Sequence, residues 1–189
     1  SAASDVYKRQ VMHQDYDGYT GEAFSVGERS PLAKINPAAA ARMAIAESLT
    51  NLVSADCDSL DRVVFSANWM AASGSNIEDQ ALFDSVKAIG EDLCPQLRMA
   101  IPVGKDSLSM RTTWREEEKE KSVLSPVSLI ASAFAPVKDV RLTTTPVLQD
   151  REGTVLLLLS LGGQRLGGSA LAQVYGQLGD DCPDLDDPM

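Results

Sequence analysis

Alternating apolar and polar residues predict two strands in the middle of the chain. Between Arg62 and Trp69 every second side chain is apolar, and Ser66 and Asn68 lie on the other side. A period of two is the pattern of a strand with one buried face. A shorter strand is expected around 98–103, just before a turn at Gly104.

Two further alternating runs predict a long β-hairpin. The first covers 108–114 and the second covers 127–134, and the charged residues 116–121 lie between them. Apolar positions with period two on both sides of a polar tip are typical of paired antiparallel strands. We expect the charged tip to be a solvated loop with no direct role in function.

A helix is expected to begin at Asn36-Pro37 and to run to about Leu52. Asparagine is a good N-cap, proline suits the first helical position, and the segment is rich in alanine. At about 100° per residue, an apolar stripe and a stripe of small or polar residues fall on nearly opposite sides. The first holds Ile45, Leu49 and Leu52, and the second holds Ala40, Ala44, Glu47 and Asn51. The second face suits close approach by something polar.

A second helix is predicted after Ser75, with Glu78 completing a capping box. Pro95 marks its end, because proline cannot continue a helix. The apolar stripe that should be buried comprises Leu82, Val86, Ile89 and Leu93.

Residues 154–161 predict the buried first strand of a second domain. This apolar run follows a polar connector at 141–153 and precedes two glycine pairs. Ser169 is a candidate cap for a helix with an apolar stripe at Leu171, Val174, Tyr175 and Leu178. Strand, glycine turn and helix are the opening of a domain, so we place one domain at 11–150 and the start of another at 151–189.

The composition indicates a folded, acidic, cytoplasmic protein. Apolar residues make up 44% of the 189 residues and the net charge is −10. Such a body repels nucleic acid and anionic membranes, so a phosphate ligand would need a local positive site. No apolar run approaches the roughly 20 residues that span a bilayer. Three widely spaced cysteines and a single histidine disfavour a disulfide framework, a metal cluster and a catalytic triad.

Glu47 and Asn51 are candidate metal ligands, because residues four apart are neighbours on a helix. A carboxylate and an amide carbonyl are the hard oxygen ligands that Mg²⁺ prefers alongside water and phosphate. The alternative is a surface glutamate and asparagine with no ligand.

The residues Gly104, Lys105, Asp106 and Ser107 form a candidate phosphate-binding turn. A turn of this composition could meet a nucleotide phosphate with its backbone N–H groups and the lysine ammonium. It lacks the spacing of a P-loop or of GxGxxG, so a plain tight turn is the alternative. In GGQRLGGS, Gly168 stands where a P-loop lysine would be, and we interpret that segment as a packing turn.

Five blocks occur together in a recognisable order. They are GEAFSVGERSPLAKINPAAAARMAIAESLTNL, FSANWMAASG, IPVGKDSLSM, SPVSLIASAFAPVKDVR and RLGGSALAQVYGQLGD. In this order they resemble the phosphoribosylformylglycinamidine synthase family (formylglycinamide ribonucleotide amidotransferase) in its large single-chain form. The resemblance runs from about Val11 to Asp187.

The resemblance implies a ligase of purine biosynthesis that uses glutamine as amide donor and ATP as energy source, with Mg²⁺ as cofactor. It implies an α+β domain like the N-terminal domain of aminoimidazole ribonucleotide synthetase (PurM-like), whose sheet pairs into a barrel. The truncated start of the α/β C-terminal domain would follow. Its partners would be the first PurM-like half and the glutaminase domain of the same polypeptide, and this piece is not expected to turn over alone.

The resemblance also implies roles for particular residues. The AESLTN block would supply magnesium ligands at Glu47 and Asn51, on a nucleotide (ATP or ADP) held in an auxiliary role. A further metal-binding aspartate of the family would fall at Lys8, and the other ligands would lie beyond Met189. Residues 1–10 do not match the family and carry no secretory pattern. We therefore expect a leader foreign to the natural gene product, which peptide mapping would test.

Two other functions remain open. The chain could be a barrel-forming scaffold whose nucleotide site is vestigial. It could also belong to another enzyme of the superfamily, such as a selenophosphate synthetase or thiamine-phosphate kinase relative, although the GERSP and SANWMAA blocks disfavour this. With the barrel partner domain absent, we also expect an uncovered apolar sheet face that promotes self-association.

Overall fold

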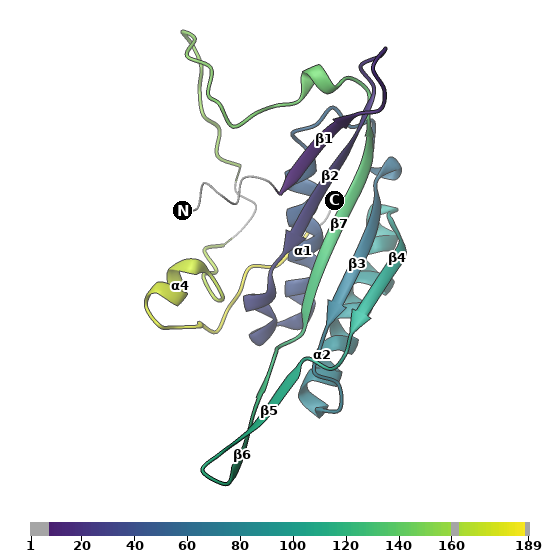
Figure 1. Ribbon diagram of the computed structural model, residues 1–189. Helices are drawn as coiled ribbons and strands as arrows, with labels where there is room; N and C mark the ends of the chain where they lie inside the picture. Colours follow the sequence, from purple (N-terminus) through teal and green to yellow (C-terminus); the bar gives the residue numbers. More distant parts are fainter. Residues whose placement is uncertain (1–7, 160–162, 188–189) are drawn as a thin grey trace.

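A five-stranded mixed sheet forms the centre of the protein. The computed structural model describes residues 8–159 and 163–187, and the strand order is β1-β2-β7-β3-β4 (Figure 1). The strands are β1 (Arg9–His13), β2 (Gly21–Glu28), β7 (Ser128–Val137), β3 (Val64–Met70) and β4 (Ala100–Ser107). All neighbouring pairs are antiparallel except β3 and β4, which run parallel.

Burial alternates along the central strands, as the sequence pattern predicts. In β3, Phe65 and Ala67 are buried, and in β7 alternate residues from Leu129 to Val137 are buried. These side chains meet the helices, whereas the side chains between them point to the other face. The strand prediction at 62–69 is confirmed. Arg9 and Gln10, from the segment that we expected to be a foreign leader, belong to β1.

Helix α1 (Pro37–Leu52) confirms the first helix prediction. The side chain of Asn36 accepts a hydrogen bond from the Ala39 N–H at 3.0 Å and caps the helix. The helix lies very close to β2, because a Cβ built on Gly27 would be 1.9 Å from the carbonyl oxygen of Ala44. Only glycine allows this approach, and it places the small-residue stripe of α1 against the sheet.

The second helix is longer and less regular than predicted. Helix α2 (Asn76–Lys87) continues into the π-helical segment η4 (Ala88–Leu93) and then α3 (Cys94–Leu97). Ile89 and Leu93 are buried as predicted, but Val86 is exposed. The Ser75 side chain makes no cap hydrogen bond, and Glu78 instead accepts from the Val127 N–H at 2.9 Å. The capping-box prediction is wrong because Glu78 ties α2 to the start of β7.

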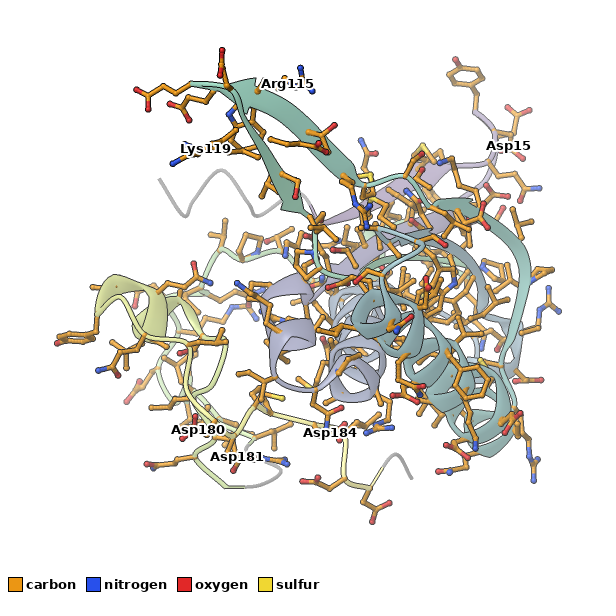
Figure 2. All side chains as sticks on the ribbon, turned by 90° about the horizontal axis from the view of Figure 1, so that it is seen from below. Asp15, Arg115, Lys119, Asp180, Asp181 and Asp184 are labelled. Atoms are coloured by element: carbon orange, nitrogen blue, oxygen red, sulfur yellow. The ribbon has the colours of Figure 1, made fainter. Side chains whose placement is uncertain are left out.

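The predicted long hairpin is two separate structures. Strand β5 (Arg111–Glu116) pairs with β6 (Lys119–Leu124) in a two-stranded ribbon, whereas β7 inserts between β2 and β3. The ribbon projects from the body with Arg115 and Lys119 at its tip (Figure 2). The charged residues 116–121 are exposed as predicted, but only 117–118 form the turn and the others belong to β5 and β6. The second arm of the hairpin is β6 and not the run at 127–134.

The prediction of a buried strand at 154–161 is wrong over its described residues, 154–159. Residues 155–159 are irregular and between 72% and 92% exposed. Further along, the Ser169 side chain caps the short helix α4 (Ala170–Val174) as predicted. Leu171, Val174 and Tyr175 are nevertheless exposed, so the helix does not bury its apolar stripe.

The architecture is a helical layer on one face of a sheet whose other face is open (Figure 1). Short 3₁₀ segments, η2 (Ser30–Lys34), η3 (Leu60–Arg62) and η5 (Val140–Leu142), join the elements. Within the described residues the sheet does not close into a barrel. None of the helices in those residues is both apolar enough and long enough to cross a membrane.

Candidate functional site

Glu47 lies at the contact between α1 and β2 and is surrounded by donors. Its Oε1 accepts a hydrogen bond from Lys8 Nζ at 2.8 Å and lies 3.4 Å from the Arg29 guanidinium. Its Oε2 accepts from the backbone N–H of Glu28 at 2.8 Å. The side chain is only 10% exposed. The polar stripe of α1 therefore does meet polar groups, and they come from this chain.

Asn51 lies one turn further along the same stripe. Its Nδ2 donates to the carbonyl oxygen of Val26 at 2.9 Å. The two side chains thus bind the backbone of β2 at Val26 and Glu28, on either side of the close contact at Gly27. Together they fasten α1 to the sheet, a role that the helical spacing alone does not reveal.

The Glu47 carboxylate suits a cation, since two cationic side chains already contact it. Among the described residues, no group of three or more histidine, cysteine, aspartate or glutamate side chains could hold a metal ion. A magnesium ion commonly uses one or two carboxylates and completes its octahedron with phosphate oxygens and water. Glu47 and Asn51 fit such a partial set, provided that the Lys8 ammonium moves away from Oε1.

A hollow of about 360 Å³ opens beside Asn51. Cations and hydroxyl groups dominate its lining, and none of the described residues contributes a carboxylate to it. The lining residues are Lys8, Arg9, Thr50, Asn51, Ser54, Thr144, Thr145 and Pro146. Within an acidic protein, this is the kind of local positive site that a phosphate group requires.

The four residues from Gly104 to Ser107 form the end of β4, so the prediction of a turn is wrong. They pair in parallel register with Ala67–Met70 of β3. Lys105 Nζ donates to Ser107 Oγ at 2.8 Å. The backbone of an edge strand cannot cradle a phosphate as a turn does, which leaves the lysine and serine side chains as the groups able to contact a ligand.

Lys105 lies on the open face of the sheet. Phe65 and Ala67 face the helices, so Asn68 and its register partner Lys105 face the other way. The Oδ1 atom of Asn68 is buried and has no hydrogen-bond partner among the residues that the structure describes. A buried hydrogen-bond acceptor without a donor destabilises the folded state. Asn68 lies on the strand next to Lys105, its register partner in β4.

The structure does not bring the two predicted sets together. Glu47 and Asn51 contact β2 from the helical layer, whereas Lys105 is on β4 and on the open face. Strands β7 and β3 separate β2 from β4, which corresponds to roughly 14 Å at the usual strand spacing. One small ligand cannot contact both sets within this chain.

The apolar half of the open face is the uncovered apolar sheet face that we expected. Phe24 and Phe134 stack at 5.1 Å between ring centroids, in register on neighbouring strands. With Met12 and Val64 they line a hollow of about 690 Å³. Exposed aromatic and aliphatic groups in one patch are unusual on a monomer and indicate an interaction surface.

The cysteines are not equipped as nucleophiles. All three are free thiols in the structure. Burial is the main cause that raises the pKa of Cys57, Cys94 and Cys182 above the usual value. A raised pKa leaves the thiol neutral and weakly reactive.

Comparison with known proteins connects this geometry to a family. The family model described as "FGAR-AT PurM_N-like domain" matches residues 4–136, a range that includes α1 and all five strands of the sheet but for the last residue of β7. The chain belongs to this family. The identification made from the five sequence blocks is therefore confirmed, whereas the expectation that residues 1–10 do not match the family is wrong for residues 4–10.

Solved structures show the same fold. PurLQS from Thermotoga maritima matches with a TM-score of 0.54 at 18% identity, over 75% of this chain and 22% of that one. T. maritima PurL complexed with ADP and PurL complexed with FGAR both match with a TM-score of 0.55 at 16% identity, over 75% of this chain. The chain spans about a fifth of the length of these proteins.

Proposed function

We propose that this chain forms part of the nucleotide-binding synthetase region of a formylglycinamide ribonucleotide amidotransferase, a glutamine-dependent ligase of cytoplasmic purine biosynthesis. The family match over α1 and the sheet carries the proposal. Solved relatives of the same fold are complexes of PurL with ATP, ADP and FGAR, which supports nucleotide binding and an FGAR substrate. Residues 11–150 would be the PurM-like N-terminal domain, and 151–189 would begin the next domain.

The chemistry requires phosphate binding more than acid–base catalysis. An amide oxygen is a poor leaving group, so ATP must phosphorylate it before ammonia can displace it. Phosphoryl transfer depends mainly on positioning and on cationic stabilisation of spread negative charge. A bound Mg²⁺ supplies part of that stabilisation by neutralising phosphate oxygens.

We assign the metal-ligand role to Glu47 and Asn51 and a phosphate-contacting role to Lys105 and Ser107. The cationic hollow beside Asn51 supports the first assignment, because a phosphate there would lie next to Asn51, one turn of α1 from Glu47. The unpartnered Oδ1 of Asn68, on the strand next to Lys105, supports a polar ligand on the open face. Gly104 and Asp106 would act only through the strand geometry that they share with Lys105.

The nucleotide retained by the purified full-length enzyme tests this proposal. Glu47→Gln keeps an acceptor for the Glu28 N–H but removes the charge, so we expect the retained ADP or ATP to fall severalfold. Glu91→Gln is a matched control, because Glu91 is 70% exposed on η4. Equal nucleotide content in all three proteins, measured by chromatography after denaturation, would contradict a metal-ligand role for Glu47.

The second candidate is a barrel-forming scaffold. The apolar hollow around Phe24 and Phe134 favours it, since a partner sheet from the first PurM-like half would bury that face. Phe134→Glu should abolish self-association of this chain in light scattering, whereas Phe83→Glu on the exposed side of α2 should not. Monomers at high concentration in the unaltered chain would remove the scaffold proposal.

A further inference from the structure

The segment after α4 returns to the helical layer and is held there. Residues 178–187, which we call the strap, contact α1 and η2 in spite of their acidic composition. Asp180, Asp181 and Asp184 of the strap are labelled in Figure 2. Cys182 is only 4% exposed in an apolar cluster with Leu32 and Ala40. Leu185 packs against the main core. A charged segment that buries Cys182 and partly buries Leu185 is part of the folded body.

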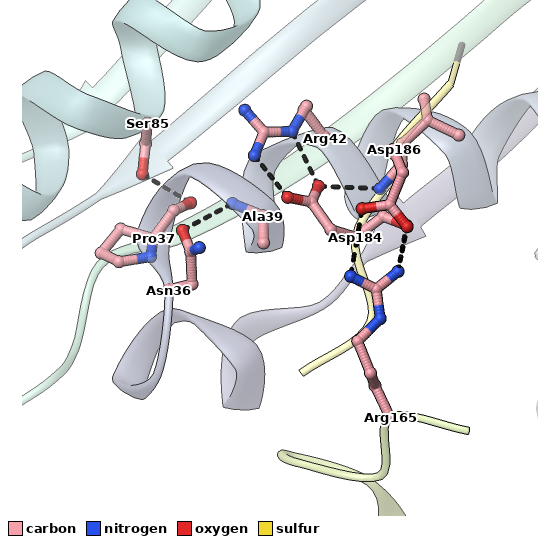
Figure 3. A network of polar contacts seen from close by, with 9 residues as sticks. Asn36, Pro37, Ala39, Arg42, Ser85, Arg165, Asp184 and Asp186 are labelled. Carbon is pink, nitrogen blue, oxygen red and sulfur yellow. Dashed lines mark hydrogen bonds and ion pairs between the residues drawn. The ribbon is translucent and has the colours of Figure 1, made fainter. Parts of the chain in front are cut away.

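A bidentate ion pair anchors the strap to α1. Arg42 donates from Nε and Nη2 to the two carboxylate oxygens of Asp184, at 2.7 and 2.5 Å (Figure 3). Their side chains are 22% and 17% exposed, so water screens the pair only in part. Burial would raise the pKa of Asp184, but the hydrogen bonds and charge of Arg42 outweigh it and lower the pKa. The carboxylate is therefore ionised at neutral pH.

The strap in turn holds the glycine turn that precedes α4. Arg165 forms a second two-oxygen pair with Asp186 and donates to the Asp184 carbonyl at 3.3 Å. The Gly167 N–H donates to the Asp181 carbonyl at 2.8 Å, and the Gly168 N–H donates to the Leu178 carbonyl at 2.7 Å. The strap thus bridges the glycine turn and α1.

The two glycines allow this contact because neither carries a Cβ. A Cβ on Gly167 would lie 2.5 Å from the Asp181 carbonyl oxygen, and Gly168 has a φ of +69°. A Cβ on Gly168 would lie 3.0 Å from the side chain of Leu32 in η2. Close packing, and not phosphate binding, therefore explains this glycine pair.

The connector that precedes the glycine turn contributes little to holding the turn and α4 in place. Residues 155–159 are irregular and more than 70% exposed. We propose that the strap is a latch that positions the turn and helix at 163–176 on the N-terminal body, and that Arg42 is its positioning residue. Opening the latch frees the glycine turn and exposes Cys182 together, because the same few contacts hold both. The inference concerns contacts within this chain and does not depend on the proposed enzymatic function.

Thiol labelling of Cys182 tests the latch. In a Cys57→Ser/Cys94→Ser background, Cys182 is the single reporter, and its labelling rate measures the open fraction of the strap. Arg42→Ala should raise the rate roughly tenfold or more, the change that corresponds to about 1.4 kcal/mol. The exchanged pair Arg42→Asp/Asp184→Arg should recover most of the slow labelling. An unchanged rate in Arg42→Ala, with an unchanged melting temperature, would overturn the proposal.

Arg141→Ala is the matched control. Arg141 also makes a bidentate ion pair, with Asp139, but the two residues are only two apart in sequence. Its other contact, with the Tyr19 ring, joins η5 to the loop between β1 and β2 and does not involve the strap. In Arg141→Ala, the labelling rate of Cys182 should stay within about twofold of the rate in the Cys57→Ser/Cys94→Ser background. A similar acceleration in both variants would mean that any lost ion pair loosens the protein, which would also overturn a specific latch.

A measurement on the unaltered chain keeps the proposal testable if a variant fails to fold. The amides of Gly167 and Gly168 donate to strap carbonyls, so their hydrogen exchange should be slow and should accelerate with added sodium chloride in parallel with Cys182 labelling. Exchange as fast as that of the exposed amides at 155–159 would show that the latch is open in solution.

Discussion

Strand β7 and the segment Val155–Leu159 are both apolar, but β7 is part of the central sheet, whereas Val155–Leu159 is exposed to solvent. Strand β7 lies between β2 and β3, and alternate residues such as Ala131 and Ala133 are fully buried. Residues 155–159 have no strand beside them in the described chain and are exposed. An apolar run becomes a buried strand only when neighbouring strands offer unpaired N–H and C=O groups. Hydrophobicity therefore identifies candidate buried strands, and backbone pairing with a neighbouring strand decides which of them form.

The largest expected effect comes from placing a charge in each apolar run. Ala131→Asp buries an unpaired carboxylate in the central strand and should prevent folding or cost several kcal/mol. Leu157→Asp, which meets only solvent, should change the free energy of unfolding by less than about 0.5 kcal/mol. Urea unfolding followed by circular dichroism measures both. Equal destabilisation would mean that residues 155–159 are packed in solution.

A second contrast compares two glycines. Gly27→Ala should cost about 1–3 kcal/mol or more, because the new methyl group collides with the backbone of α1 and must displace the helix. Gly163→Ala places its methyl group in open space and should have an effect near zero. Thermal melting of the two variants checks this. A harmless Gly27→Ala would contradict the close contact between α1 and β2.

The smallest expected effect concerns the hydrogen bonds that join α1 to β2. Asn51→Ala leaves the Val26 carbonyl without its side-chain donor and should cost about 1 kcal/mol. Gln80→Ala, on the exposed side of α2, removes a surface hydrogen bond to Asp84 and should cost a few tenths of a kcal/mol. Chemical denaturation resolves the difference, and a larger loss for Gln80→Ala would reverse the ranking.

Local patterns predicted the elements whose stability is local. Asn36 caps α1 as expected, and the alternation around Phe65 correctly marks β3. The partner of β7 was not predictable, because a period of two does not say which strand lies alongside. For the same reason Gly104 to Ser107 resembled a turn: its extended form depends on pairing with β3.

The candidate site was only partly predictable. Helical spacing identified Glu47 and Asn51 as a polar pair, but their bonds to the backbone of β2 depend on the approach of α1 at Gly27. The latch between Arg42 and Asp184 joins residues 142 positions apart. No pattern within a short window encodes such a contact, and only the folded chain reveals it.

Our central proposal is that α1 presents Glu47 to a magnesium-bound nucleotide. Calorimetric titration of the full-length enzyme with ADP, with and without Mg²⁺, tests it most directly. We predict that Mg²⁺ strengthens ADP binding, that Glu47→Gln removes most of this magnesium-dependent gain, and that Glu91→Gln preserves it. ADP binding that is identical with and without Mg²⁺, or a gain that survives in Glu47→Gln, would contradict the account.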